Sequence, residues 1–146
     1  MSACTFFGHR DCYGLEETVL MQSIRRLVEK GVDKFYVGHQ GQFDNMVFRC
    51  LSAIRACYPH ISVFVVLAYL PLQPSLDDRY HGYSILPEGI EIGLPRFAIE
   101  RRNRWMLERA DYCLCYIHRA RGGAYKFAKQ AKQRGLVVIN LGSLSL

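Results

Sequence analysis

Residues 61–68, with the sequence ISVFVVLA, place the strongest constraint on the fold. The segment is apolar at every position except Ser62, so both faces of a strand formed by it would be buried. Such a strand is typical of the centre of a parallel sheet that is covered by helices on both sides. The chain is therefore expected to be an α/β protein in which strands and helices alternate.

Segments before and after this strand continue the alternation. Apolar residues at helical spacing follow Leu15 until Gly31, where a glycine is expected to end the helix. The expected strands are residues 3–8, 34–38, 61–68, 112–117 and 136–141, and further helices are expected at 43–54, at 97–110 and from Ala124. Right-handed crossovers then predict one Rossmann-like domain over residues 1–146, a three-layer sandwich of about five parallel strands in the order 3-2-1-4-5.

Residues 69–95 interrupt the pattern. They contain four of the five prolines and no sustained hydrophobic period. A loop of this length inside a compact domain is either a functional lid or a sign of an element that the pattern does not reveal. The segment is expected to be a long loop that covers a ligand.

The positive charge is concentrated in one part of the chain. The net charge is +6, but residues 96–134 hold eleven Lys and Arg against three acidic residues, and the remainder is slightly acidic. This asymmetry favours an anionic partner, either a small phosphorylated ligand or, less strongly, a nucleic-acid backbone. A basic face that only maintains solubility is the alternative.

The six cysteines predict neither a metal site nor a disulfide framework. No C-x-x-C pair occurs, so zinc-ligand spacing is missing. Cys113 and Cys115 share one face of an expected strand, as small core residues would. No signal peptide is expected before the first strand, and the longest apolar run is too short to cross a membrane. A cytoplasmic protein without a membrane partner or a bound metal is expected, and a homo-oligomer is left open.

Three glycine-bearing turns follow strands and predict a ligand site. They are residues 8–10, 38–41 and 119–123. The carboxyl ends of parallel strands share one edge, and ligands bind there where the strand order reverses. The candidate ligand-binding residues are Gly8, His9, Arg10, Gly38, Gln40, Gly41, Asp44, Arg102, Asn103, Arg119, Arg121, Gly122 and Gly123.

The Gly122-Gly123 pair before the last helix is the expected anion site. Free backbone N–H groups and the helix dipole favour a phosphate there, aided by Arg119, Arg121 and Arg10. Asp44 either accepts a ribose hydroxyl or only favours its helix N-terminus. His9 either contacts a ligand or is a turn histidine bonded to the backbone. Neither a G-x-G-x-x-G fingerprint nor a P-loop is present, which argues against a dinucleotide oxidoreductase and a P-loop NTPase.

Several segments, in order over essentially the whole chain, resemble the YpsA-like branch of the SLOG superfamily. They are CTFFGHRDC, FYVGHQGQFD, LPEGIE, PRFAIERRNRWMLERADYCLCYI, GGAYKFAKQAK and VVINL. The resemblance implies a Rossmann-like domain that binds a nucleotide or a nucleotide derivative, in some members as a sensor. The superfamily also includes the LOG phosphoribohydrolases and the single-strand-binding DNA-processing protein A group.

The resemblance also implies a comparison with LOG catalysis. LOG enzymes carry an arginine four residues before a methionine, which Arg102 and Met106 match. Their P-G-G-x-G-T-x-x-E motif ends in a glutamate, but the corresponding residue here is Phe127, and Ala124 stands in place of the threonine. Phenylalanine cannot stabilise an oxocarbenium-like centre or activate water. Glycosidic hydrolysis is therefore disfavoured, with Arg102, Glu100 and Asp44 as the remaining catalytic candidates.

The leading expectation is a domain that binds a nucleotide or nucleotide-derived ligand, with no certain cofactor. The alternatives are a LOG-like enzyme that cleaves a nucleotide N-glycosidic bond and, third, a protein that binds single-stranded nucleic acid. The last predicts binding that weakens steeply with salt.

Overall fold

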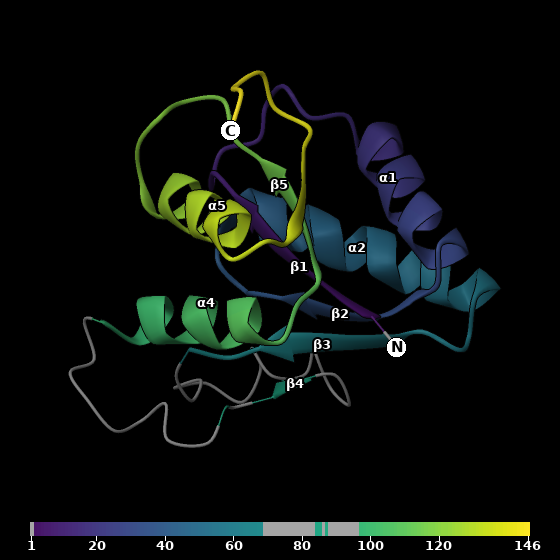
Figure 1. Ribbon diagram of the computed structural model, residues 1–146. Helices are drawn as coiled ribbons and strands as arrows, with labels where there is room; N and C mark the ends of the chain where they lie inside the picture. Colours follow the sequence, from purple (N-terminus) through teal and green to yellow (C-terminus); the bar gives the residue numbers. More distant parts are fainter. Residues whose placement is uncertain (1, 69–83, 86, 88–96) are drawn as a thin grey trace.

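The computed structural model describes residues 2–68, 84–85, 87 and 97–146, and Figure 1 shows how their helices and strands are arranged. The elements are β1 (Ser2–Gly8), α1 (Glu17–Glu29), β2 (Val32–Val37), α2 (Gly41–Cys57), β3 (Ser62–Val66), β4 (Ser84–Ile85), α4 (Ala98–Glu108), β5 (Tyr112–Tyr116), α5 (Gly123–Gln133) and β6 (Val137–Asn140). In this part of the chain the strands form one parallel sheet in the order β4-β3-β2-β1-β5-β6. The predicted α/β, Rossmann-like class is confirmed.

The prediction of five strands in the order 3-2-1-4-5 is wrong. The sheet of the described residues has a sixth strand, β4, which pairs with β3 through Val65 opposite Ser84 and Val66 opposite Ile85. A two-residue strand carries no recognisable hydrophobic period, so the sequence pattern could not reveal it. It also interrupts the predicted 69–95 loop. Apart from residues 84–85 and 87, that segment lies outside the described residues, and its role as a lid stays a prediction.

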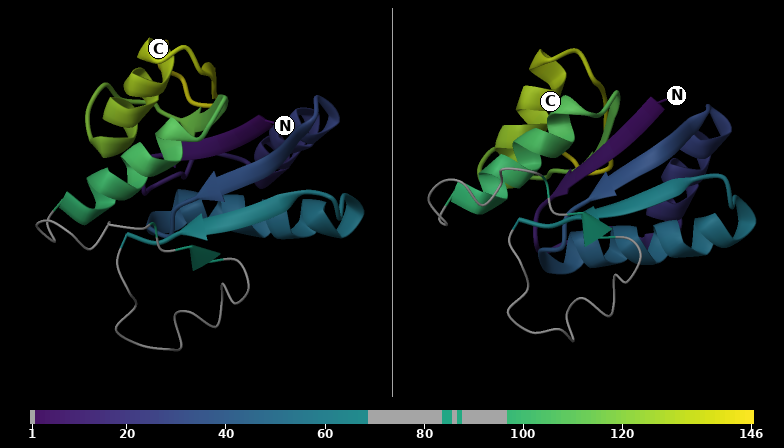
Figure 2. Two further views of the ribbon diagram at one scale, coloured as in Figure 1. Left: turned by 60° about the horizontal axis from the view of Figure 1, so that its bottom comes forward. Right: turned by 90° about the horizontal axis from the view of Figure 1, so that it is seen from below.

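Each face of the sheet is covered by a pair of helices (Figure 2). One core cluster joins α1 and α2 to Cys4 and Phe6 of β1. A second joins α4 and α5 to Ala3 and Phe7 of the same strand. Alternate residues of β1 thus enter opposite cores, as the strand period of two requires. This confirms the three layers.

The strands β1 and β5 end together, since Gly8 lies opposite Tyr116 in their parallel register. The chain continues from β1 towards β2 and β3 on one side, whereas β5 and β6 lie on the other. The strand order therefore reverses between β1 and β5, and a crevice is expected beyond their carboxyl ends. Both α2 and α5 begin at this edge.

The cysteines are placed mainly in the core. Cys57 is exposed at the last position of α2, whereas the other five are buried. Cys113 and Cys115 pack in the core beneath α4 and α5, as predicted. Burial raises the pKa of the Cys50 thiol to about 11, so this thiol stays protonated at neutral pH. No helix within the described residues combines the length and the apolar character needed to cross a membrane.

Candidate functional site

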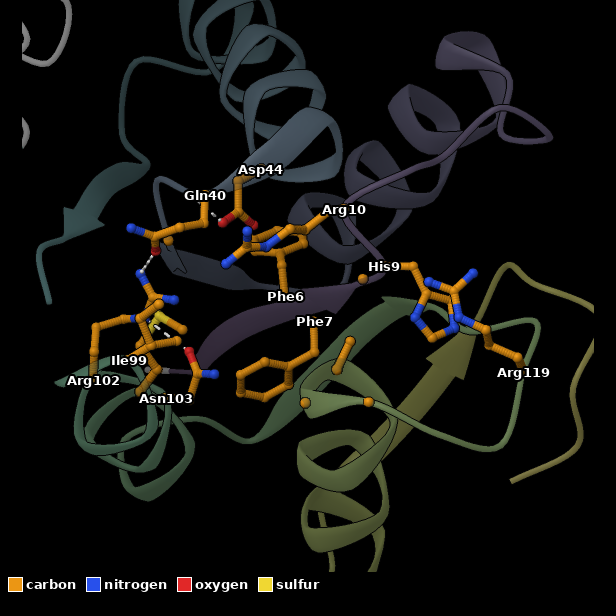
Figure 3. Close-up of a pocket in the computed structure, with 16 residues that line it drawn as sticks. Phe6, Phe7, His9, Arg10, Gln40, Asp44, Ile99, Arg102, Asn103 and Arg119 are labelled. Carbon is orange, nitrogen blue, oxygen red and sulfur yellow. Dashed lines mark hydrogen bonds between the residues drawn. The ribbon is translucent and has the colours of Figure 1, made fainter. Parts of the chain in front are cut away.

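A pocket of about 320 Å³ lies at the carboxyl edge of the sheet (Figure 3). Its wall comes from four parts of the chain: the end of β1 and the turn after it, the turn after β2 with the start of α2, one side of α4, and the turn that leads into α5. The lining residues are Phe6, Phe7, Gly8, His9, Arg10, Gly38, Gln40, Asp44, Ile99, Arg102, Asn103, Met106, Arg119, Gly122, Gly123 and Ala124. The three glycine-bearing turns therefore do converge.

Most of the predicted site residues line this pocket. They are Gly8, His9, Arg10, Gly38, Gln40, Asp44, Arg102, Asn103, Arg119, Gly122 and Gly123. Gly41 and Arg121 do not line it, and Arg121 is exposed beside the α5 start. Ligand binding by any of these residues stays a prediction, but their common location is a finding.

Sequence reasoning missed the apolar part of the wall. Phe6 and Phe7 were predicted only as strand residues, yet the last residues of a strand reach the same edge as the turn that follows it. Ile99 lies on the same α4 face as Arg102 and Asn103, three and four residues further on. Helical spacing from Arg102 was the signal that could have identified Ile99.

The start of α5 forms an open backbone surface in the pocket. Gly122 has a φ of 92°, a conformation that favours glycine, and the helix has no side-chain cap. A Cβ atom added at Gly122 or Gly123 would meet no protein atom within 4 Å. The first N–H groups of a helix have no partner inside the helix, so this surface is suited to an anion.

Arg102 is a buried cation on the opposite side of the pocket. Its side chain is held by donated hydrogen bonds from Nε to Asn103 Oδ1 at 2.7 Å and from Nη1 to Gln40 Oε1 at 3.0 Å. Nη1 also lies 3.4 Å from the carbonyl oxygen of Val66. A buried guanidinium needs such acceptors, because an unpaired charge in the interior is costly.

Asp44 places a carboxylate beside this cation. One of its oxygens accepts a hydrogen bond of 2.9 Å from the backbone N–H of Gln40. Burial raises the pKa of Asp44 to about 6, although Arg102, the Gln40 N–H and Arg10 all act to lower it. At neutral pH Asp44 is therefore largely ionised, and its carboxylate can accept hydrogen bonds from a ligand.

His39, which follows β2, is a neutral residue of the same region. Its Nε2 atom accepts a hydrogen bond of 3.3 Å from the backbone N–H of Ala68. Burial and, to a smaller extent, the Arg102 charge lower the pKa of His39 to about 4. The uncharged form of His39 therefore links the residues that follow β2 to the residues that follow β3 through this hydrogen bond.

The other end of the pocket contains a second group of titratable side chains. The rings of His9 and His118 meet edge to face with 4.6 Å between their centroids. Arg119 Nη2 lies 3.2 Å from Asp11 Oδ1, and Figure 3 shows the Arg119 guanidinium beside His9. Arg10 points the other way, towards Asp44. The pocket thus has two polar ends.

The glycines of the first two turns are required by the packing of the protein's own side chains. A Cβ atom on Gly8 would lie 2.4 Å from the ring of Phe43, and one on Gly38 would lie 2.7 Å from Arg102 Nη1. Gly41 has a φ of 83°, and a Cβ atom added to it would lie 3.0 Å from the Cα, Cβ and Cγ atoms of Arg10. These three glycines make room for the side chains that shape the pocket.

Two of the three catalytic candidates from the LOG comparison lie together, and the third lies apart from them. Arg102 and Asp44 line the pocket, but Glu100 does not, and its carboxylate pairs with Lys126 at 3.1 Å on the surface. Phe127 is buried and stacks on Phe7 with 5.6 Å between the ring centroids. The residue that the resemblance aligns with the LOG glutamate is thus a core residue.

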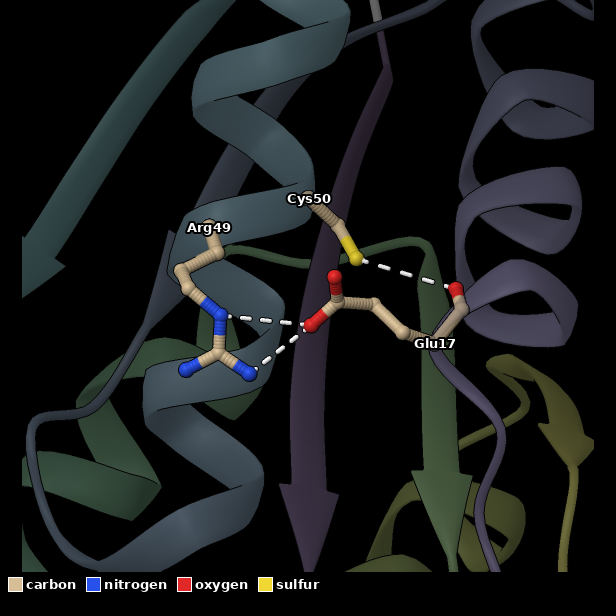
Figure 4. Close-up of polar contacts among 3 residues, drawn as sticks. All are labelled: Glu17, Arg49 and Cys50. Atoms are coloured by element: carbon tan, nitrogen blue, oxygen red, sulfur yellow. Dashed lines mark hydrogen bonds and ion pairs between the residues drawn. The ribbon is translucent and has the colours of Figure 1, made fainter.

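A further charged cluster lies outside the pocket, where α1 meets α2 (Figure 4). Arg49 Nη2 lies 2.7 Å from Glu17 Oε1, and Cys50 Sγ is 3.9 Å from the Glu17 carbonyl oxygen. The ion pair is largely exposed and contributes little stability. Among the residues that the structure describes, no group of three His, Cys, Asp or Glu side chains is placed to hold a metal ion.

No known family model matches this chain, and no curated protein matches it either. The resemblance to the YpsA-like branch of the SLOG superfamily therefore stays a prediction, and the geometry of the pocket is the basis for assigning a function.

Proposed function

We propose that this protein binds a nucleotide or a nucleotide-derived ligand in the pocket at the carboxyl edge of its sheet. One observation carries the proposal: an uncapped helix start with open glycines, at α5, faces the same cavity as a buried arginine and a carboxylate. The cavity of about 320 Å³ is at the small end of the range typical of ligand pockets, roughly 300–1,000 Å³.

The two polar ends suit the two polar parts of a nucleotide. The phosphate is placed at Gly122 and Gly123, where backbone N–H groups and Arg119 supply donors and positive charge. The Asp44 carboxylate and the side chain of Gln40 are placed to bind ribose hydroxyl groups. The buried rings of Phe6 and Phe7 supply the apolar wall between these ends.

Calorimetry with AMP, ADP and ADP-ribose tests the proposal, with thermal unfolding as a second readout. Binding stabilises the folded state by mass action, so at least one of these ligands is expected to raise the unfolding temperature. If none of them releases heat or shifts unfolding at millimolar concentration, the proposal fails.

The variant Gly123→Val tests the phosphate position. Its side chain enters space that no protein atom occupies, so the free energy of unfolding should change by less than about 1 kcal/mol. It should weaken the binding of AMP roughly tenfold or more, because it excludes the anion from the helix start. Calorimetry measures the affinity. Adenosine, which lacks the phosphate, is the control ligand; equal losses for AMP and adenosine would contradict this placement.

Asp44 keeps a second candidate function open to test. It is a carboxylate that lines the pocket, and cleavage of an N-glycosidic bond requires such a group. Chromatographic detection of free base from AMP would identify a hydrolase, and Asp44→Asn should then abolish base release. Binding to single-stranded nucleic acid stays a prediction that a salt titration tests.

A further inference from the structure

His9 is the buried titratable side chain of the pocket that the nucleotide proposal leaves without a role. It lines the same cavity as Gly122 and Gly123, and only 3% of its surface is exposed. Its Nε2 atom has no hydrogen-bond partner among the described residues. A buried polar atom without a protein partner is unusual in folded proteins, and this one is available to bind a molecule that enters the pocket.

The groups that face His9 keep it uncharged. From the turn after β5, the ring of His118 and the guanidinium of Arg119 approach it, and from the turn after β1 the carboxylate of Asp11 lies nearby. Burial, followed by the charges of Arg119 and His118, lowers the pKa of His9, while Asp11 and a hydrogen bond with the Arg119 backbone oppose this shift. In the ligand-free protein His9 is therefore a neutral imidazole at pH 7.

An anion at the α5 start reverses this balance. A phosphate group carries up to two negative charges near pH 7, and an opposite charge within a few ångströms favours the protonated form of a histidine. Protonation of the imidazole gives both ring nitrogens an N–H group, so Nε2, which has no partner among the residues that the structure describes, can donate to the anion. Arg119, which opposes protonation in the free protein, would then be neutralised by the same anion.

We propose that His9 binds the ligand phosphate as an imidazolium, so that ligand binding is accompanied by the uptake of one proton from solvent. This inference rests on the proposed function and adds to it a specific property of the phosphate site. Affinity should then fall as the pH rises, up to tenfold per pH unit between pH 7 and 8. Ligands with a neutral group in place of the phosphate should show no such dependence.

Calorimetry of AMP and ADP-ribose at pH 7, in buffers of low and high ionisation enthalpy, measures the proton uptake. In His9→Gln the amide can still donate a hydrogen bond but cannot be protonated, so its proton balance is subtracted from that of the wild type. The difference should approach one proton, and the affinity of His9→Gln should be several-fold lower and nearly constant between pH 7 and 8. His118→Gln is the matched control, because it keeps His9 and should retain the uptake.

The outcomes separate the two proposals. Binding of either nucleotide without proton uptake in the wild type overturns the role of His9 and leaves nucleotide binding in place. Equal proton uptake in the wild type and in His9→Gln does the same. If AMP, ADP and ADP-ribose all fail to bind, both proposals are overturned together. The wild-type measurement alone can overturn the role of His9. The inference can therefore be tested even if His9→Gln folds poorly.

Discussion

Replacement of Arg102 by alanine is expected to lower the free energy of unfolding by about 3 kcal/mol. The substitution removes the donor to Asn103 Oδ1 and Gln40 Oε1, and Asp44 loses a nearby positive charge. Buried acceptors without a donor and a carboxylate without a cation both destabilise the folded state. Urea unfolding monitored by circular dichroism measures this loss.

The variant Arg104→Ala is the matched control for this prediction. Arg104 lies on the same helix, α4, but is exposed, so its replacement should change the free energy of unfolding by less than about 0.5 kcal/mol. If both variants lost the same free energy of unfolding, the hydrogen bonds of buried Arg102 would not be the cause of the destabilisation.

Asp44→Asn is expected to make the protein more stable at pH 8, by as much as about 3 kcal/mol, and to leave its stability near pH 4 unchanged. The pKa of Asp44 is raised to about 6, so burial favours its protonated form, which asparagine imitates. The stability that protonated Asp44 provides is complete below its ordinary pKa and is lost as the pH rises through about 6. The asparagine variant does not suffer that loss.

His39 has the opposite pH dependence. Its pKa is lowered to about 4, so its contribution is complete above the ordinary histidine pKa and is lost as the pH falls through about 4. Between pH 4 and 6 the effects of His39 and Asp44 oppose one another. Asp44→Asn should therefore show a steeper rise of stability with pH than the wild type across this interval. Urea unfolding at half-unit steps from pH 4 to 8 tests this, and parallel curves for the two proteins would contradict it.

The stabilising variant should also bind nucleotide more weakly. An asparagine retains one acceptor oxygen but loses the negative charge that makes Asp44 a strong acceptor for hydroxyl groups. A residue that costs stability where it stands is typical of a binding or catalytic site. If Asp44→Asn gains stability and binds AMP as tightly as the wild type, Asp44 is not part of the ligand site.

The sequence predicted the fold because its strong signals are local. The apolar segment 61–68 and the helical spacing after Leu15 each indicate one element, and the rule for crossovers then places the elements in layers. The sequence did not predict β4, because a strand of two residues has no hydrophobic period. Its pairing depends on β3, and no local pattern in the sequence records that contact.

The site was predictable to the extent that it consists of turns at strand ends. The convergence of residues 8–10, 38–41 and 119–123 follows from the parallel sheet alone. The roles of individual residues did not follow in this way. Gly8 makes room for Phe43, and Arg102 is held by Gln40 from a distant turn, because side-chain packing selects these partners.

The placement of the thiols offers a practical route to these measurements. Five cysteines are buried, so a maleimide dye should react with Cys57 alone. Cys57 ends α2, and Asp44, the residue of this helix that lines the pocket, lies 13 residues before it, which separates the dye from the ligand by roughly 20 Å. A dye at this position leaves the site sterically free, so energy transfer from it to a nucleotide that carries an acceptor dye can follow ligand titrations without mutagenesis.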